Sequence, residues 1–224
     1  MGNEKKELEQ RFYDAKLDAL DGRDNAVAGT VRGVPVVFNS RANLGEFDEI
    51  IEPGALTGTD LTDVRLCLNH DTSYVYARSR RNQPNSTMRL AVTDRGLEIE
   101  ADLDIEGSPR AKDLYSAIRL GNIDHMSFMF SVDEDRWDDL ASDHPTRHIT
   151  KIGSIVEVSA VTFPAYSATS IDARSKEALD NARAQAALDS AKAAEGNTLD
   201  SVDETRSLDL EKAKTHILAT FKIN

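Results

Sequence analysis

Cysteine and long apolar runs are scarce in this sequence. Cys67 is the only cysteine among 224 residues, so an intramolecular disulfide and a cysteine-based zinc site are excluded. Because Cys67 lies in the apolar run Val64–Leu68, we expect a buried thiol that packs like a small hydrophobic residue. No run approaches the ~20 apolar residues of a membrane span, and the polar start MGNEKKELEQ lacks a signal-peptide core. We therefore expect neither membrane insertion nor secretion.

Positive charge is also in deficit. The chain has 27 lysines and arginines against 39 acidic residues, and its net charge is −12. A surface of this charge repels nucleic acids and anionic membranes, so we expect neither as a partner. Apolar residues make up 40% of the chain, which is typical of a globular protein with a core. The length fits one ordinary domain with an appendage.

Alternation of apolar and polar residues predicts about seven short strands and one helix between residues 11 and 167. Candidate stretches for them lie near 13–19, 27–38, 64–70, 88–92, 97–103, 126–132, 147–152 and 155–163. Ser108 and Pro109 predict the start of the helix, and Gly121 predicts its end. We expect residues 1–10 to be a loose helix or a disordered lead-in, and the acidic segment 133–145 to be a loop. This spacing favours a mainly β fold with helices (α+β), a barrel or a sandwich, over a parallel α/β sheet.

The composition changes after Ile171. Residues 177–194 are rich in alanine and predict a helix with a thin apolar face. Residues 207–221 carry an apolar stripe at helical spacing that needs a partner surface. We therefore expect a domain over residues 1–171 and a helical tail over residues 172–224 that docks on another surface.

The strand expected at Met126–Val132 places a serine where a nucleophile would be held firmly. Ser127 faces away from Met126 and Phe128 in the two-residue alternation of the strand. A rigid element suits a nucleophile because a small misplacement lowers the rate. A strand serine that only bonds a neighbour is the simpler reading, so Ser127 needs a base and an orienting group to support a catalytic role.

Five histidines are candidates for that base. His70 ends the expected strand 64–70 and enters a loop, as a residue at the rim of a barrel does. His125 ranks second, because two residues of extended chain set it roughly 6.5–7 Å from Ser127. His144 and His216 are expected to be solvated, and His148 begins a strand.

Glu157 is the candidate for the group that orients the histidine. It lies in the apolar strand Ile155–Val161, where a carboxylate is costly to bury unless it is paired. An ion pair with an arginine and a hydrogen bond to an imidazole both fit that requirement. A serine, a histidine and a carboxylate that each need a partner form the combination used in nucleophilic hydrolysis.

Several strings, taken in order, resemble the prohead (capsid maturation) proteases of tailed bacteriophages, a family related in fold to the herpesvirus assemblins. These strings are GVPVVFNS (33–40), LGEFDEIIEPGAL (44–56), NHD (69–71), RGL (95–97), the segment 121–130 with MSF, and EVSAVTFPAYSAT (157–169). The likeness runs from about residue 27 to residue 170, roughly two thirds of the chain.

The resemblance implies a serine endopeptidase on a herpesvirus-protease-like β-barrel surrounded by helices. It implies His70 as the base, Ser127 as the nucleophile and Glu157 as the third member, with His148 as the alternative because assemblins use a second histidine there. The implied substrates are scaffold, the scaffolding segment of the major capsid protein and the protease itself, inside the assembling prohead in the bacterial host cytoplasm. The tail would then target the enzyme into the shell and be clipped.

The resemblance also leaves several features open. It requires no metal or cofactor, and a homodimer is an alternative by analogy with the assemblins. Backbone N–H groups of residues 165–169 are the candidates for an oxyanion hole. Two other functions stay open from the residues alone: a non-enzymatic capsid assembly or scaffolding protein on the same fold, and a metal hydrolase that uses His70, Asp71 and His125.

Overall fold

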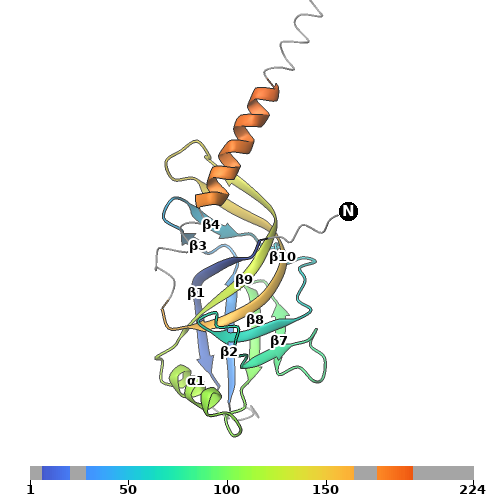
Figure 1. The fold of residues 1–224 in the computed structure, drawn as a ribbon, viewed down its shortest axis with the longest axis vertical. Coiled ribbons are helices and arrows are strands. Elements are labelled where there is room, and N and C mark those ends of the chain that lie inside the picture. Colours follow the sequence, from blue (N-terminus) through green and yellow to red (C-terminus); the bar gives the residue numbers. More distant parts are fainter. Residues whose placement is uncertain (1–6, 21–28, 164–175, 194–224) are drawn as a thin grey trace, which may run out of the picture. The chain divides into compact units, whose positions relative to one another are not determined.

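A computed structural model describes residues 7–20, 29–163 and 176–193 (Figure 1). The chain divides into two compact units, Met1–Glu177 and Ala178–Asn224. The described part contains two helices, α1 (Pro109–Arg119) and a helix over residues 176–193, which confirms the helix expected near 177–194. Neither helix is long and apolar enough to cross a membrane. The second expected tail helix, 207–221, lies outside the described residues.

The described residues of the first unit form one sheet of ten strands. They are β1 (Glu9–Ala19), β2 (Thr30–Val37), β3 (Arg41–Asn43), β4 (Asp48–Ile51), β5 (Val64–Leu68), β6 (Ala77–Ser79), β7 (Met88–Val92), β8 (Gly96–Asp102), β9 (His125–Asp138) and β10 (Thr146–Val161). The hydrogen-bonded order is β3-β4-β10-β9-β1-β2-β8-β7, and β5 with β6 branches from β10. The hairpin predicted from residues 88–92 and 97–103 is confirmed as β7 and β8.

The fold is mainly β with helices, as predicted, but the barrel of about seven strands is not confirmed. Among the described residues the sheet is open, because its path ends at the three-residue strand β3 and at β7. Strands as short as β3 and β6 show no periodicity that sequence analysis can detect, so the number of strands was underestimated. The branch at β10 arises because one long strand pairs with β4 along its first part and with β5 along its second part.

The long antiparallel pair β9 and β10 crosses the whole unit (Figure 1). Residues 133–138 continue β9, so the loop expected over 133–145 is shorter than predicted. Likewise, β10 is one strand where two were predicted. Acidic side chains face solvent along the end of β9, and backbone pairing with β10 keeps this segment extended. Register shifts between residues 149 and 157 mark bulges, which let a strand of this length bend.

The strand β1 begins earlier than the sequence predicts. Residues 9 and 10, expected in a loose lead-in, pair with Phe130 and Met129 of β9. On its other edge β1 pairs with β2. This strand therefore links the two halves of the sheet, and it passes beside Ser127, which pairs with Phe12.

Helix α1 begins as its sequence predicts. The Ser108 side chain accepts a hydrogen bond from the N–H of Ala111, Pro109 occupies the first turn, and Gly121 follows the helix with a φ of 72°. Its buried side chains, Ala111, Leu114 and Ile118, join the core that also contains Phe128 and Phe130 of β9. The face of β9 opposite Ser127 is thus fixed by apolar packing.

Candidate active site

The middle of strand β10 brings the candidate residues together. Ser159 lies opposite Ser127 of β9 on one side and opposite Cys67 of β5 on the other. Glu157 is two residues before Ser159, so both side chains lie on the same face of the strand. The chain then leaves β5 after Leu68, and His70 turns back over that face.

The turn at Asn69 and His70 aims the imidazole. Both residues have left-handed backbone conformations, with φ values of 52° and 60°. This region is uncommon for residues other than glycine, although asparagine and histidine are enriched in it. The side-chain oxygen of Asn69 accepts hydrogen bonds from the backbone N–H and the hydroxyl of Thr162, at 2.9 and 3.2 Å. The turn is therefore fastened to the end of β10.

Both ring nitrogens of His70 have partners at hydrogen-bond distance. Nε2 lies 2.7 Å from Ser127 Oγ, and Nδ1 lies 2.7 Å from Glu157 Oε2. The other carboxylate oxygen of Glu157 accepts a hydrogen bond from the Ser159 hydroxyl. A carboxylate at Nδ1 favours the tautomer that carries its hydrogen there, which leaves the Nε2 lone pair directed at the serine.

Ser127 is buried, although it lies on the face of the strand opposite Met126 and Phe128. It is 3% exposed, and Glu157 is 2% exposed, whereas the His70 side chain is 18% exposed. The strand β1 lies beside the serine in the sheet, and Ser127 Oγ donates a hydrogen bond of 2.8 Å to the carbonyl oxygen of Arg11. Each buried polar group of this site therefore has a hydrogen-bond partner.

The single hydrogen of the Ser127 hydroxyl has two acceptors within reach, Arg11 O and His70 Nε2. With a protonated ring, Nε2–H donates to Oγ, and the hydroxyl hydrogen points to the carbonyl of Arg11. With a neutral ring, Nε2 and Arg11 O both accept, and attack needs the hydrogen directed at Nε2. Protonation of the His70 ring leaves the Arg11 carbonyl as the acceptor for the hydroxyl hydrogen.

A buried ionic network holds β1 beside the nucleophile. Arg11 Nε donates to Glu49 Oε1 at 2.6 Å, and Arg147 Nη1 donates to Glu49 Oε2 at 3.1 Å. Arg11 and Arg147 also bond Glu9, and the Tyr13 hydroxyl donates to Glu49.

The network shifts the pKa values of its members. Burial alone would raise the pKa of Glu9, but the two arginines outweigh it and hold that pKa below its usual value. Burial and the Glu49 carboxylate both raise the pKa of Tyr13.

The other described histidines have partners elsewhere. His148, the alternative orienter, lies 3.0 Å from Glu52 and 3.1 Å from Asp138, and none of its contacts reaches His70 or Ser127. His125 bonds Asp124, and His144 lies near Asp48 and Asn43.

The three residues considered as metal ligands, His70, Asp71 and His125, do not form a cluster. No group of three potential ligands occurs among the residues that the structure describes.

Cys67 is fully buried beside the site, as predicted. Burial, with a smaller contribution from the Glu157 carboxylate, raises the pKa of its thiol to about 11. At neutral pH the thiol is therefore protonated and is a poor nucleophile.

Three contributors escaped sequence analysis: Ser159, Asn69 and the carbonyl of Arg11. Ser159 follows Glu157 in the same alternation as a hydroxyl on the same face, so strand periodicity could have found it. Asn69 was harder to detect, because its sequence shows only an asparagine next to a strand end. The role of the Arg11 carbonyl could not be detected, because every residue type has the same backbone carbonyl. The segment proposed for the oxyanion hole, 165–169, lies outside the described residues.

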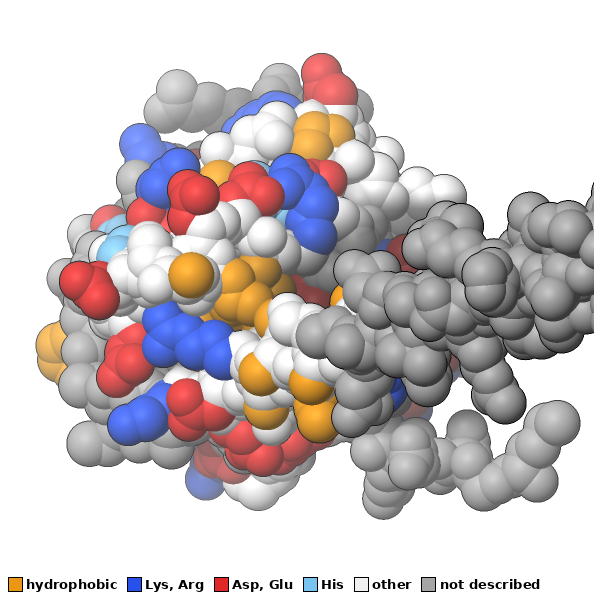
Figure 2. Space-filling view, turned by 90° about the horizontal axis from the view of Figure 1, so that it is seen from above, with side chains coloured by type: hydrophobic (Ala, Val, Ile, Leu, Met, Phe, Trp, Pro, Cys, Tyr) orange, Lys and Arg blue, Asp and Glu red, His pale blue; other side chains and the backbone are white. Residues whose placement is uncertain are grey.

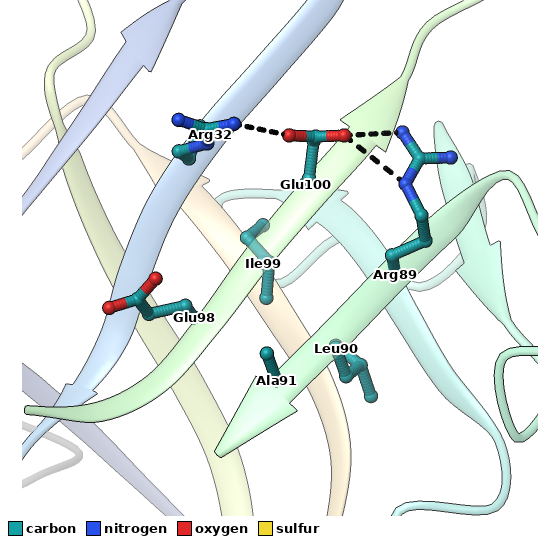
Figure 3. A pocket seen from close by; sticks show the side chains of 7 residues that line it. All are labelled: Arg32, Arg89, Leu90, Ala91, Glu98, Ile99 and Glu100. Atoms are coloured by element: carbon teal, nitrogen blue, oxygen red, sulfur yellow. Dashed lines mark hydrogen bonds and ion pairs between the residues drawn. The ribbon is translucent and has the colours of Figure 1, made fainter. Parts of the chain in front are cut away.

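A pocket elsewhere on the sheet shares no residue with this site. Figure 3 shows it over β2, β8 and β7, where Glu100 lies between two arginines. Arg32 and Arg89 bond Glu100 at 2.6 and 2.8 Å, so the arginines that line the pocket are neutralised by ion pairs. Acidic and basic side chains are likewise interspersed on the face in Figure 2.

On this mainly β fold, hydrogen bonds link a serine to a histidine and the histidine to a glutamate. The same arrangement of side chains characterises the class of serine hydrolases. Comparison with known families narrows this class. Residues 14–184 match the caudovirus prohead serine protease family, and the chain belongs to that family. Membership implies a serine peptidase and supports a protease role in the maturation of bacteriophage capsids.

No curated protein and no solved structure gives a significant match. The likeness to the herpesvirus assemblins therefore stays a prediction. The division into a protease domain, 1–171, and a tail, 172–224, also stays a prediction.

Proposed function

We propose that this chain is a serine endopeptidase with His70, Ser127 and Glu157 as its catalytic triad. The observation that carries the proposal is the pair of 2.7 Å contacts that join the two nitrogens of His70 to Ser127 and Glu157. Hydrogen-bonded series of nucleophile, base and carboxylate recur on unrelated folds that carry out acyl transfer. The family membership independently favours the same chemistry.

In this mechanism His70 Nε2 takes the hydrogen of Ser127 as Oγ attacks a peptide carbonyl. Glu157 stabilises the imidazolium that forms, and the ring then gives its proton to the leaving amine. Water attacks the acyl-enzyme with His70 again as the base, and Ser127 regains its hydrogen. The carbonyl of Arg11 competes for that hydrogen, so the hydroxyl must turn toward Nε2 before each attack.

We further infer that the substrates are scaffold, the scaffolding segment of the major capsid protein and the chain itself. The action would take place inside the assembling prohead, in the cytoplasm of the bacterial host. The family supports this assignment through its association with the prohead. Self-cleavage would remove part of the tail, residues 172–224, once the shell has assembled.

The test compares the wild-type chain with Ser127→Ala, each incubated alone and with the precursor of the capsid protein. Intact mass should show truncated products in the wild type and none in the variant. Ser127→Ala should stay folded at a cost of about 1 kcal/mol, because it removes hydrogen bonds from a buried site. Identical processing by the variant would refute the proposal, and a wild type that cuts neither itself nor the precursor would favour a non-enzymatic assembly protein.

A further inference from the structure

Ser159 joins two parts of the site that the triad itself does not connect. Its side chain is fully buried on β10. The hydroxyl donates to Glu157 Oε1 and accepts a hydrogen bond of 3.0 Å from the backbone N–H of His70. A hydroxyl has one hydrogen to donate and lone pairs to accept, so both bonds form at once. The carboxylate and the backbone of the base are therefore held by one atom.

Each of these bonds fixes a degree of freedom that matters for proton transfer. The Glu157 carboxylate has its Oε2 at the imidazole, and the bond at Oε1 opposes rotation of the group away from it. His70 has a left-handed backbone with a φ of 60°, a conformation that persists only where its surroundings hold it. The bond from its N–H to Ser159 Oγ ties that backbone to the strand that carries Glu157.

We propose that Ser159 is a positioning residue that sets the relative geometry of His70 and Glu157. This inference rests on the proposed triad. Ser159 has no hydrogen bond to Ser127 Oγ or to the imidazole ring, so its effect reaches the reaction through the other two side chains. Removal of the Ser159 hydroxyl should lower the rate of the chemical step more than it lowers the affinity for a substrate.

The experiment measures covalent labelling of Ser127 by a fluorophosphonate in the full-length chain, with the maximal rate separated from the binding constant of the reagent. Ser159→Ala should label about 10²-fold more slowly than the wild type, because small misplacements of reacting groups cost rates of that order. The decrease should appear in the maximal rate of labelling and not in the binding constant of the reagent. Ser159→Thr, which keeps the hydroxyl, should recover most of it.

Two further measurements separate positioning from a general loss of stability. The NMR resonance of the hydrogen between His70 Nδ1 and Glu157 should weaken or shift in Ser159→Ala and persist in Ser159→Thr. Ser79→Ala is the matched control, because Ser79 is also fully buried and its hydroxyl both donates to and accepts from Asn82. This control should label at the wild-type rate.

The outcomes distinguish the two proposals. If the wild type is not labelled at Ser127, the proposed function fails. If the wild type is labelled and Ser159→Ala matches it in rate and resonance, or Ser159→Thr is as slow as Ser159→Ala, the role of Ser159 is overturned. If Ser159→Ala does not fold, Ser159→Cys keeps the volume with a much weaker donor, and wild-type labelling of that variant overturns the role equally.

Discussion

At the scale of single residues, the site depends on one imidazole with a different partner on each nitrogen. Glu157 at Nδ1 and Ser127 at Nε2 give the ring a direction for proton movement, and the carbonyl of Arg11 gives the serine a second partner. Ser127 and Glu157 could be identified from the sequence as polar residues on apolar strands, and His70 as a histidine where an apolar strand ends. Sequence analysis could not rank Glu157 above His148 securely, since only the register of β10 brings Glu157 to the histidine.

The choice between these two residues gives the first prediction. Glu157→Gln removes the charge that orients His70 and stabilises its charged form, so labelling of Ser127 by a fluorophosphonate should fall by about 10⁴-fold. His148→Gln is the matched control and should label at the wild-type rate, because the partners of His148 are Glu52 and Asp138. A large loss in His148→Gln with a small loss in Glu157→Gln would reverse the assignment.

Cys67 gives a second prediction at this scale. Its thiol is buried and has a pKa of about 11, so it is protonated across the neutral range. Iodoacetamide at pH 7 should leave the native chain unmodified and should not slow labelling of Ser127, whereas the unfolded chain should be alkylated. Rapid alkylation of the native chain with loss of labelling would point to a thiol nucleophile.

At the scale of elements, strand β9, which carries Ser127, is held between two neighbours. β1 with its ionic network pairs with one edge of β9, and β10 pairs with the other edge. The sequence predicted where most strands lie, because their inner faces are apolar at every second residue. The first residues of β1 were missed, since Arg11 is buried and Glu9 is half-buried as ion pairs and not as apolar groups. The end of β9 was also missed, where the side chains face solvent and backbone pairing alone keeps the strand extended.

The network predicts a large loss of stability when its central carboxylate is removed. Glu49→Gln removes the fully buried anion that Arg11 and Arg147 share and leaves them only Glu9 in common, so the free energy of unfolding should fall by about 3–5 kcal/mol. Glu52→Gln is the matched control three residues away, and it should cost less than about 1 kcal/mol because the Glu52 side chain is itself partly exposed in its pairs with Arg136 and His148. Denaturant unfolding measures both, and equal small losses would show that the network contributes little.

Glu9 predicts how stability depends on pH. Because its pKa is lowered from 4.5 in the folded chain, its contribution is complete above that pH and is lost as the pH falls through the folded pKa. The difference in unfolding free energy between the wild type and Glu9→Gln should therefore be constant near neutral pH and should shrink below about pH 4.5. A constant difference down to pH 3 would contradict this account.

At the scale of the whole molecule, the long pair β9 and β10 explains how residues far apart in sequence share one site. His70 comes from the end of β5, Ser127 from β9 and Glu157 from β10, which lies between those two strands. The class of serine hydrolases, the candidate triad residues and the mainly β fold could be predicted, because each has a local signature in the sequence. The open order of ten strands could not, since it depends on which edges pair and on bulges that no residue type marks.

The most direct test of the whole account is to locate the adduct after the wild-type chain reacts with a fluorophosphonate. Peptide mapping by tandem mass spectrometry should find one adduct, on Ser127, and Ser127→Ala should remain unmodified. An adduct on another residue of the folded wild-type chain, or none under conditions where a known serine protease reacts completely, would contradict the central claim that His70 and Glu157 activate Ser127.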